Sequence, residues 1–265
     1  MSARLPENRA GDRPEAINRR NLLVLCSIGL AVGLVGTIAT MRHDNGATAV
    51  TGQGGQRTYA VSDFERISAV GPRQVVVSVG PAFSVRGTGS ADALDRFEVA
   101  VDHGALKIEP KHSAWWDFSW GKTGAATFYV TLPQLSAASF VGSGDMKIDK
   151  VTGQRFAASV AGSGQMEIGA LSVDDAEFSL AGSGDLAAGG KVARAHVSVA
   201  GSGDMNAPGL ISDTAEVSMV GSGGAALTVN SQADISIIGS GDVAIGGSAH
   251  CKVSRIGSGD VKCPT

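Results

Sequence analysis

The residues best suited to chemistry are acidic side chains that recur at one distance from a repeated Gly-Ser-Gly triplet. The triplet occurs seven times between Gly142 and Gly259, every 18–20 residues. Counted from the first glycine of each triplet, position +3 is in turn Asp145, Gln165, Asp185, Asp204, Gly224, Asp242 and Asp260. If the repeats stack on one another, these carboxylates form a row.

Two roles suit such a row. Stacked carboxylates can bind Ca²⁺, which prefers oxygen ligands, and the candidate ligands are Asp185, Asp204, Asp242 and Asp260. Alternatively, each carboxylate accepts backbone N–H groups at a corner of the chain, with no metal involved. Gln165 and Gly224 interrupt the row, so the sequence favours the second role, and we expect no cofactor.

The cysteines form no metal-binding motif, because the three of them are scattered and no Cys-x-x-Cys occurs. Cys26 lies in an apolar run. Cys251 and Cys263 lie six residues before and six residues after the first glycine of the last triplet, and the alternation of the repeat predicts that both face inward. We predict that these two form a disulfide that closes the last repeat, which requires an oxidising compartment. Two buried free thiols are the alternative.

All three tryptophans fall within six residues. Trp115, Trp116, Phe118 and Trp120 can form an exposed aromatic platform for a sugar, a lipid headgroup or a partner protein. The alternative, which we favour, is a flap that covers an open end of the core.

The sequence offers little to a catalytic mechanism. The five histidines are scattered, and the triplets lack the Gly-x-Ser-x-Gly pattern of a nucleophile elbow. The outward positions of the repeat are mostly Ser, Ala and Gly, so we identify no catalytic residue. The net charge of −3 gives no electrostatic reason to expect a nucleic-acid partner.

The flanks of the triplets indicate what positions these residues. Apolar side chains alternate with small polar ones on both sides of each triplet, as in two strands that each turn one face inward. Glycine suits the corner between them, because it adopts positive φ without a Cβ clash. Repeats of 18–20 residues are too short for propeller blades and fit single coils of an all-β solenoid. We expect a β-helix domain over residues 58–265, with irregular coils and a cap over 58–135 and seven coils over 136–265.

Within the irregular part, local signals are clear. Strands of alternating polarity are separated by turn residues, and Asp102-His103-Gly104 predicts a hairpin. A short helical pattern from Ala91 to Arg96 has Ser90 as its N-cap.

The N-terminal part predicts targeting to a membrane. A polar, arginine-containing segment, 1–21, precedes 20 uncharged residues, 22–41, which are long enough for one helix across a bilayer. This helix is either a retained signal anchor or a cleaved signal peptide. The positive-inside rule then puts residues 43–265 on the periplasmic or extracytoplasmic side, or outside the cell after cleavage. Residues 42–57 are rich in Gly, Thr and Gln and read as a flexible linker.

Several segments resemble one bacterial family, the putative auto-transporter adhesin, head GIN domain proteins. The resemblance covers about residues 60–250 and is carried by Phe64-Glu65-Arg66-Ile67, Val75–Val79, Ala105–Ile108, Val130–Pro133 and Val141–Met146. It implies a secreted or envelope domain of the right-handed parallel β-helix type and supplies no catalytic residues.

We therefore expect a non-enzymatic cell-envelope domain, an adhesin-like or scaffold module that binds an envelope protein or a glycan and contacts the membrane through residues 22–41. A purely structural envelope protein and a polysaccharide-acting β-helix enzyme are the alternatives.

Overall fold

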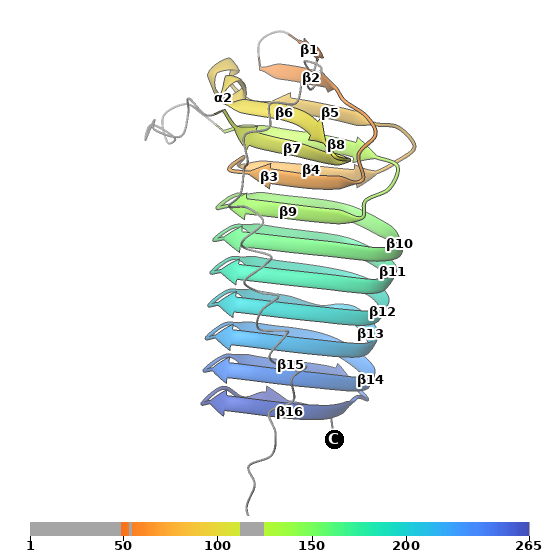
Figure 1. The fold of residues 1–265 in the computed structure, drawn as a ribbon, viewed down its shortest axis with the longest axis vertical. Helices are drawn as coiled ribbons and strands as arrows, with labels where there is room; N and C mark the ends of the chain where they lie inside the picture. Colours follow the sequence, from red (N-terminus) through yellow and green to blue (C-terminus); the bar gives the residue numbers. More distant parts are fainter. Residues whose placement is uncertain (1–48, 53–54, 112–124, 265) are drawn as a thin grey trace, which may run out of the picture. The chain divides into compact units, whose positions relative to one another are not determined.

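The computed structural model describes residues 49–52, 55–111 and 125–264 (Figure 1). The chain divides into two units, 1–43 and 44–265, and the described residues all belong to the second. In these ranges no helix is both long and apolar enough to cross a membrane. The helix expected over 22–41 and the Trp115–Trp120 segment lie outside the described residues, so both remain predictions.

The centre of the domain is a stack of long parallel strands, one above the other (Figure 1). These strands are β10 (Asp145–Gly162), β11 (Gln165–Gly182), β12 (Asp185–Gly201), β13 (Asp204–Gly221) and β14 (Gly224–Gly239). Each runs most of the way around one coil and pairs with the next, so that the first glycines of successive triplets lie opposite each other. The predicted all-β solenoid is therefore confirmed, with about six turns.

Glycine at the corners is required by the approach of one coil to the next. Gly221 has a φ of +130°, and a Cβ built there would lie 2.0 Å from the carbonyl oxygen of Gly201 in the preceding coil. A Cβ at Gly223 would lie 2.1 Å from the carbonyl oxygen of Gly203. Any side chain here would push neighbouring coils apart, which explains why the triplet recurs in each coil.

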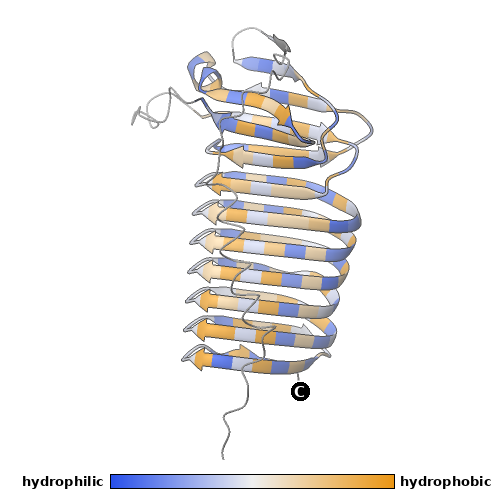
Figure 2. Ribbon diagram, viewed as in Figure 1, coloured by the Kyte–Doolittle hydropathy of each residue, from blue (hydrophilic) through white to orange (hydrophobic). Residues whose placement is uncertain are grey.

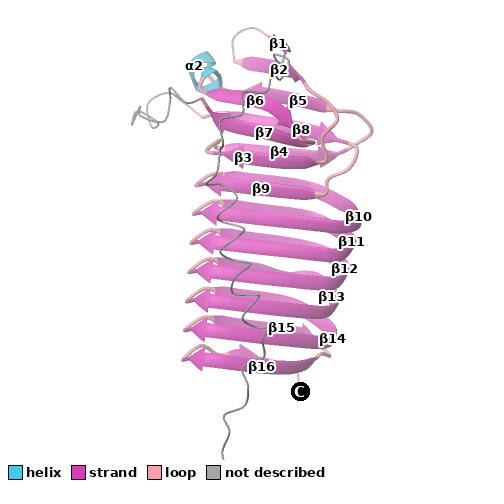
Figure 3. Ribbon diagram, viewed as in Figure 1, coloured by secondary structure: helices cyan, strands magenta, loops and turns pink. Residues whose placement is uncertain are grey.

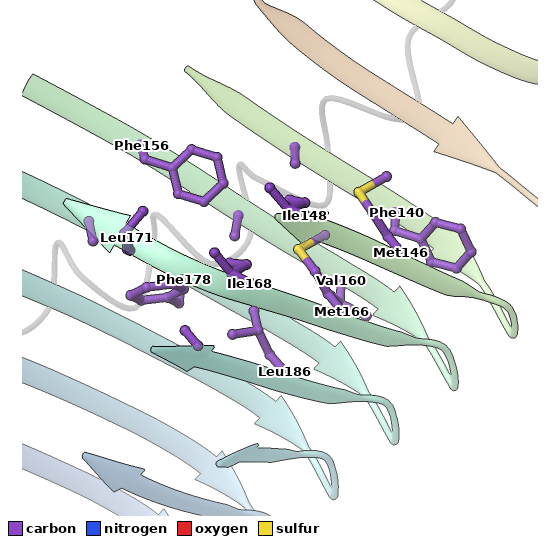
Figure 4. Close-up of a cluster of buried hydrophobic side chains, with 14 of the residues drawn as sticks. Phe140, Met146, Ile148, Phe156, Val160, Met166, Ile168, Leu171, Phe178 and Leu186 are labelled. Atoms are coloured by element: carbon purple, nitrogen blue, oxygen red, sulfur yellow. The ribbon is translucent and has the colours of Figure 1, made fainter. Parts of the chain in front are cut away.

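Apolar side chains from all along each coil fill the interior of the stack. The alternation of apolar and polar residues is visible along each strand in Figure 2, and Figure 4 shows ladders such as Met146 above Met166 above Leu186. These three side chains are at most 1% exposed, as are Phe140 and Phe178. Removal of such side chains from water contributes about 1.5–3 kcal/mol each.

Shorter strands connect the stack to the N-terminal cap. They are β3 (Arg66–Val70), β4 (Gln74–Val79) and β9 (Ala137–Gly142). β3 pairs in parallel with β9, and β4 pairs in parallel with β10. The Asp145 backbone N–H donates to the Arg73 carbonyl (2.9 Å), and the Val79 N–H donates to the Asp149 carboxylate (3.0 Å). The cap and the stack are therefore joined by backbone–backbone and by backbone–side-chain hydrogen bonds.

The cap, which we define as residues 56–110 and 127–135, mixes parallel with antiparallel pairing and contains the helix (Figure 3). Besides β3 and β4 it contains β2 (Gln56–Ala60), β5 (Ser84–Thr88), α2 (Ala91–Asp95), β6 (Phe97–Asp102), β7 (Ala105–Pro110) and β8 (Thr127–Leu132). The Ser90 hydroxyl accepts a hydrogen bond from the Ala93 N–H (3.2 Å), which confirms the predicted N-cap. His103 (φ 49°) and Gly104 (φ 72°) form the turn of the β6–β7 hairpin, which was also expected.

Two boundaries differ from the prediction. Strands β1 (Ala49–Thr51) and β2 lie partly or wholly inside the range 42–57 expected to be a linker, because β2 completes a ladder with β5 and β1 adds to β2. At the other end, seven coils were expected, and the strands described are shorter: β15 (Asp242–Gly247), β16 (His250–Gly257) and, after the seventh triplet, the two-residue β17 (Val261–Lys262).

Candidate functional sites

The described part of the cap contains a cleft of about 550 Å³ where three connections meet. These are the segment between β2 and β3, the segment between β4 and β5, and the turn of the β6–β7 hairpin. The cleft is lined by Asp63, Phe64, Glu65, Arg66, Phe83, His103 and Gly104. We call it the cap cleft.

An aromatic pair forms the apolar part of the cap cleft. Phe64 is 1% exposed and belongs to the core, whereas Phe83 is half-buried and packs against the core from outside. Their ring centroids are 5.0 Å apart, with 51° between the planes. The tilted contact holds the Phe83 ring in place while part of its surface stays open to a ligand.

Charged and polar groups surround this ring. The side chains of Asp63, Glu65, Arg66 and His103 are exposed. Carboxylates only accept hydrogen bonds, a guanidinium only donates them, and an imidazole can do both. The cap cleft can therefore meet a ligand that carries both donors and acceptors.

Hydrogen bonds fix the backbone under these side chains. The Glu65 N–H donates to the Gly104 carbonyl (3.1 Å), the Arg66 Nη2 donates to the His103 carbonyl, and the Ser136 N–H donates to the Glu65 carbonyl (2.8 Å). These bonds tie together segments that are about 40 and 70 residues apart in sequence.

Asp63 has an unusual backbone conformation. Its φ of 61° lies in the left-handed region that non-glycine residues seldom adopt, and its carboxylate accepts a hydrogen bond from the Ser62 hydroxyl (2.7 Å). Such a conformation costs about 1–3 kcal/mol and persists only where the surrounding structure holds it. The strained residue therefore lies at the rim of the cleft.

An ion-pair cluster next to the turn orients His103. Asp102 accepts from the Lys107 ammonium group (2.6 Å) and pairs with the His103 Nδ1 (2.5 Å). The hydrogen bond from Lys107, aided by His103, holds the pKa of Asp102 below its ordinary value. The aspartate stays ionised and occupies the Nδ1 edge of the imidazole.

None of the sequence-based site predictions included the cap cleft. In the sequence, Phe64, Glu65 and Arg66 belong to a segment that carries the family resemblance, and His103 belongs to a predicted hairpin turn. No periodic spacing links residues 63–66, 83 and 103, so only tertiary structure brings them together.

The acidic row of the stack lies where the repeat predicted it. The Asp204 carboxylate accepts from the Gly224 N–H (2.6 Å), and the Asp242 carboxylate accepts from the Asp260 N–H (2.8 Å). Both donors belong to the next coil, not to the corner of the same coil. Among the described residues, no group of three or more acidic, His or Cys side chains is arranged to hold a metal ion. Two of the four candidate Ca²⁺ ligands thus have a structural role, and their role in metal binding remains a prediction.

The terminal coil contains the predicted disulfide between Cys251 and Cys263, whose Cα atoms are 6.4 Å apart. Both residues pack, partly buried, against the core. Arg255 replaces an inward apolar residue, and its Nη1 donates to the Gly259 carbonyl (2.5 Å). Val253 (45% exposed) and Ile256 (69% exposed) are among the most exposed large apolar residues described.

Together these features define a parallel β-solenoid with a folded cap at its N-terminal end. A family model described as "putative auto-transporter adhesin, head GIN domain" matches residues 63–249, and the chain belongs to this family. The resemblance suggested by the sequence is therefore confirmed. No curated protein matches the chain.

Solved structures of bacterial proteins share the fold. One, described as a putative lipid binding protein from Parabacteroides distasonis, is 26% identical, with a TM-score of 0.64 over 81% of this chain and 98% of its own. A putative adhesin from Bacteroides fragilis is 22% identical, with a TM-score of 0.72 over 80% and 97%. A putative adhesin from Parabacteroides merdae is 17% identical, with a TM-score of 0.61 over 80% and 96%. The last two likenesses concern the fold alone.

Proposed function

We propose that this protein is a non-enzymatic, adhesin-like interaction module of the cell envelope, in which the stack is a rigid support and the cap recognises the ligand. The observation that carries the proposal is the contrast in surface between these parts. The stack repeats parallel pairing and a Gly-Ser-Gly corner from coil to coil, with register shifts only away from these corners, whereas the cap folds three connections around an open cleft with a half-buried aromatic ring.

A rigid support suits adhesion because its conformational entropy is lost when the protein folds, so little more is lost when a ligand binds. The coils are joined by parallel ladders from β10 to β14, and the glycine positions at their corners leave no room for a Cβ atom. At about 4.8 Å per coil, the stack holds the cap some tens of ångströms from its opposite end. The family description and the adhesin neighbours support the same function.

Location in the envelope is part of the proposal. The Cys251–Cys263 disulfide suits an oxidising compartment, in agreement with the orientation expected from residues 1–41. Attachment through residues 22–41, either as an anchor or transiently as a signal peptide, follows from the sequence alone.

The ligand class is open to direct test. The 26%-identical neighbour described as a putative lipid binding protein brings lipids into consideration beside proteins and glycans. Purified full-length protein should bind saturably to isolated bacterial envelopes, and fractionation into protein, glycan and lipid should retain the activity in one fraction. A lack of saturable binding to intact envelopes and to all three fractions would contradict the proposal.

An enzyme acting on polysaccharides is the competing function. Incubation of the envelope glycan fraction with the protein should release no new reducing ends or unsaturated sugars, at protein concentrations that give saturable binding. Release that depends on Asp63 and Glu65 would replace binding by catalysis as the function of the cap cleft.

A further inference from the structure

We propose that the cap cleft binds a neutral, hexose-sized unit of a glycan, with one face of the sugar ring on Phe83 and its hydroxyl groups on the carboxylates of Asp63 and Glu65. This inference rests on the proposed function and specifies its ligand. It is carried by the size of the cleft, its aromatic surface and the balance of its charges.

The size of the cleft suits a small ligand. Its volume of about 550 Å³ falls within the roughly 300–1,000 Å³ typical of small-molecule sites. It is also open to the surface, so one unit of a longer chain can enter while the rest of the chain extends outside. A site of this kind recognises a terminal or branching sugar better than a flat sheet does.

The aromatic surface selects a ligand with an apolar face. Phe83 lies half-buried with its ring fixed by Phe64, which is itself in the core. Pyranose rings present C–H groups on one face, and these pack on an aromatic ring in the same way as other apolar surfaces. The remainder of a sugar is polar, which matches a single ring surrounded by hydrogen-bonding groups.

The charges argue against anionic ligands. Asp63 and Glu65 together oppose an anion such as a phosphate, and Arg66 offsets only one of these two negative charges. Hydroxyl groups both donate and accept hydrogen bonds, so a neutral sugar can donate to the two carboxylates, accept from Arg66 and contact His103. Neutral polyhydroxylated ligands therefore suit this cleft best.

The cleft is organised before the ligand arrives. Glu65, Arg66 and Gly104 are joined across two connections by the bonds from the Glu65 N–H to the Gly104 carbonyl and from Arg66 to the His103 carbonyl. Asp63 is held at positive φ, next to the hydroxyl of Ser62. Groups that are already ordered lose little conformational entropy on binding, so weak individual contacts can add up to measurable affinity.

The test uses full-length protein and a named set of probes: glucose, galactose, mannose and N-acetylglucosamine, with short neutral oligosaccharides of each. Binding is measured by calorimetry and by ligand-observed NMR. We expect at least one probe to bind saturably, and Phe83→Ala to weaken its binding by about tenfold or more. Asp63→Asn should also weaken binding, because asparagine tolerates positive φ but removes the charged acceptor.

Two controls separate loss of the site from loss of the fold. Phe83→Leu keeps an apolar side chain of similar size and should retain the melting temperature while it loses most sugar affinity. Glu177→Gln, on the exposed face of the stack, should leave sugar binding unchanged. Each variant is compared with the parent by circular dichroism and thermal unfolding.

The outcomes distinguish this inference from the function on which it rests. Saturable envelope binding without binding of any probe, or probe binding that survives both Phe83 variants, overturns the sugar site and leaves the interaction module intact. Tighter binding of an anionic vesicle than of any sugar likewise overturns it. Absence of binding to both envelopes and probes overturns both proposals.

Discussion

The stack and the cap are both built from β-strands, but the strands are arranged regularly in the stack and irregularly in the cap. In the stack, each coil pairs in parallel with the coil before it and has a glycine corner at the same place, although the register shifts elsewhere along β11 to β14. In the cap, antiparallel pairs, a hairpin and a one-turn helix interrupt the pattern. Repetition places corresponding residues opposite each other along most of the stack, where the hollows have volumes of about 350 and 380 Å³, whereas its interruption brings side chains from three connections together in the larger cap cleft of about 550 Å³. The comparison teaches that the departures from the repeat are where recognition should be sought.

The largest expected difference between the two parts concerns glycine. Gly221→Ala in the stack should lower the free energy of unfolding by more than about 3 kcal/mol, because the new Cβ would meet the backbone oxygen of Gly201, which cannot move without separating two coils. Gly104→Ala in the cap also replaces a glycine at positive φ, but its Cβ would have nothing nearer than the Arg66 guanidinium at 4.0 Å. Its cost should be about 1–2 kcal/mol.

Urea unfolding of the two variants measures this contrast. Equal losses of stability would contradict the idea that coil-to-coil contact, and not φ alone, selects glycine at the corners. A variant at Gly221 that stays soluble and folded can also be examined by hydrogen exchange, where the loss of protection should begin at β12 to β14.

Sequence reasoning succeeded where structure is periodic. The alternation of apolar residues around each triplet predicted which side chains point into the core. When such a pattern repeats and the repeats stack, only one face of each strand can turn inward and bury the apolar side chains. Ser90 and the Asp102-His103-Gly104 turn were also predictable, because capping and turn formation depend on neighbouring residues.

The rest depends on contacts between distant segments. Alternation predicted strands in the cap, but it does not say which strand pairs with which or in which direction. For the same reason the range expected to be a linker included β1 and the first two residues of β2, although β2 pairs with β5. The cap cleft was not predicted either. The row of aspartates was located correctly, yet the backbone groups that Asp204 and Asp242 bind belong to neighbouring coils.

The two ends of the core offer a second contrast. The cap covers one end, and the Cys251–Cys263 disulfide closes the terminal coil at the other. Replacement of both cysteines by alanine should remove about 3 kcal/mol of local stability, as expected for a cross-link that closes a short loop. Hydrogen exchange should show faster exchange in β16 and β17, with protection in the cap and in β10 to β13 unchanged. Faster exchange throughout the domain would show instead that the disulfide stabilises the whole solenoid.

Surface ion pairs should contribute less in both parts. In the stack, Arg194 forms two hydrogen bonds with Asp175, and this holds the pKa of Asp175 below its ordinary value. In the cap, Lys107 and then His103 lower the pKa of Asp102. A lowered pKa means that each pair adds stability above the unfolded-state pKa of about 4 and loses it as pH falls through the lower, folded-state value.

Because these groups are exposed or only partly buried, solvent screens the pairs, and the effect on stability should be small. Urea unfolding across pH 2–7 (about the range over which aspartates titrate) should show Arg194→Gln with a slightly weaker decline in acid than the parent. Lys107→Gln should behave likewise in the cap. An acid transition abolished by either substitution would contradict this view of a domain held together by its core and ladders.

The smallest expected effect is that of calcium. Since the carboxylates of Asp204 and Asp242 already accept backbone N–H groups, addition of Ca²⁺ or of a chelator should leave the melting temperature unchanged. A rise in melting temperature with Ca²⁺ that Asp242→Asn abolishes would restore the predicted metal row and give the stack a ligand of its own.

The central claim, that the cap recognises and the stack supports, is tested most directly by the affinity of two charge-matched variants for isolated envelopes. One combines Asp63→Asn with Glu65→Gln in the cap, and the other combines Asp213→Asn with Glu177→Gln on the exposed surface of the stack. With folding verified for both, the cap variant should bind at least about tenfold more weakly than the parent, and the stack variant should bind within about twofold of it. A loss of affinity in the stack variant with full affinity in the cap variant would contradict the claim.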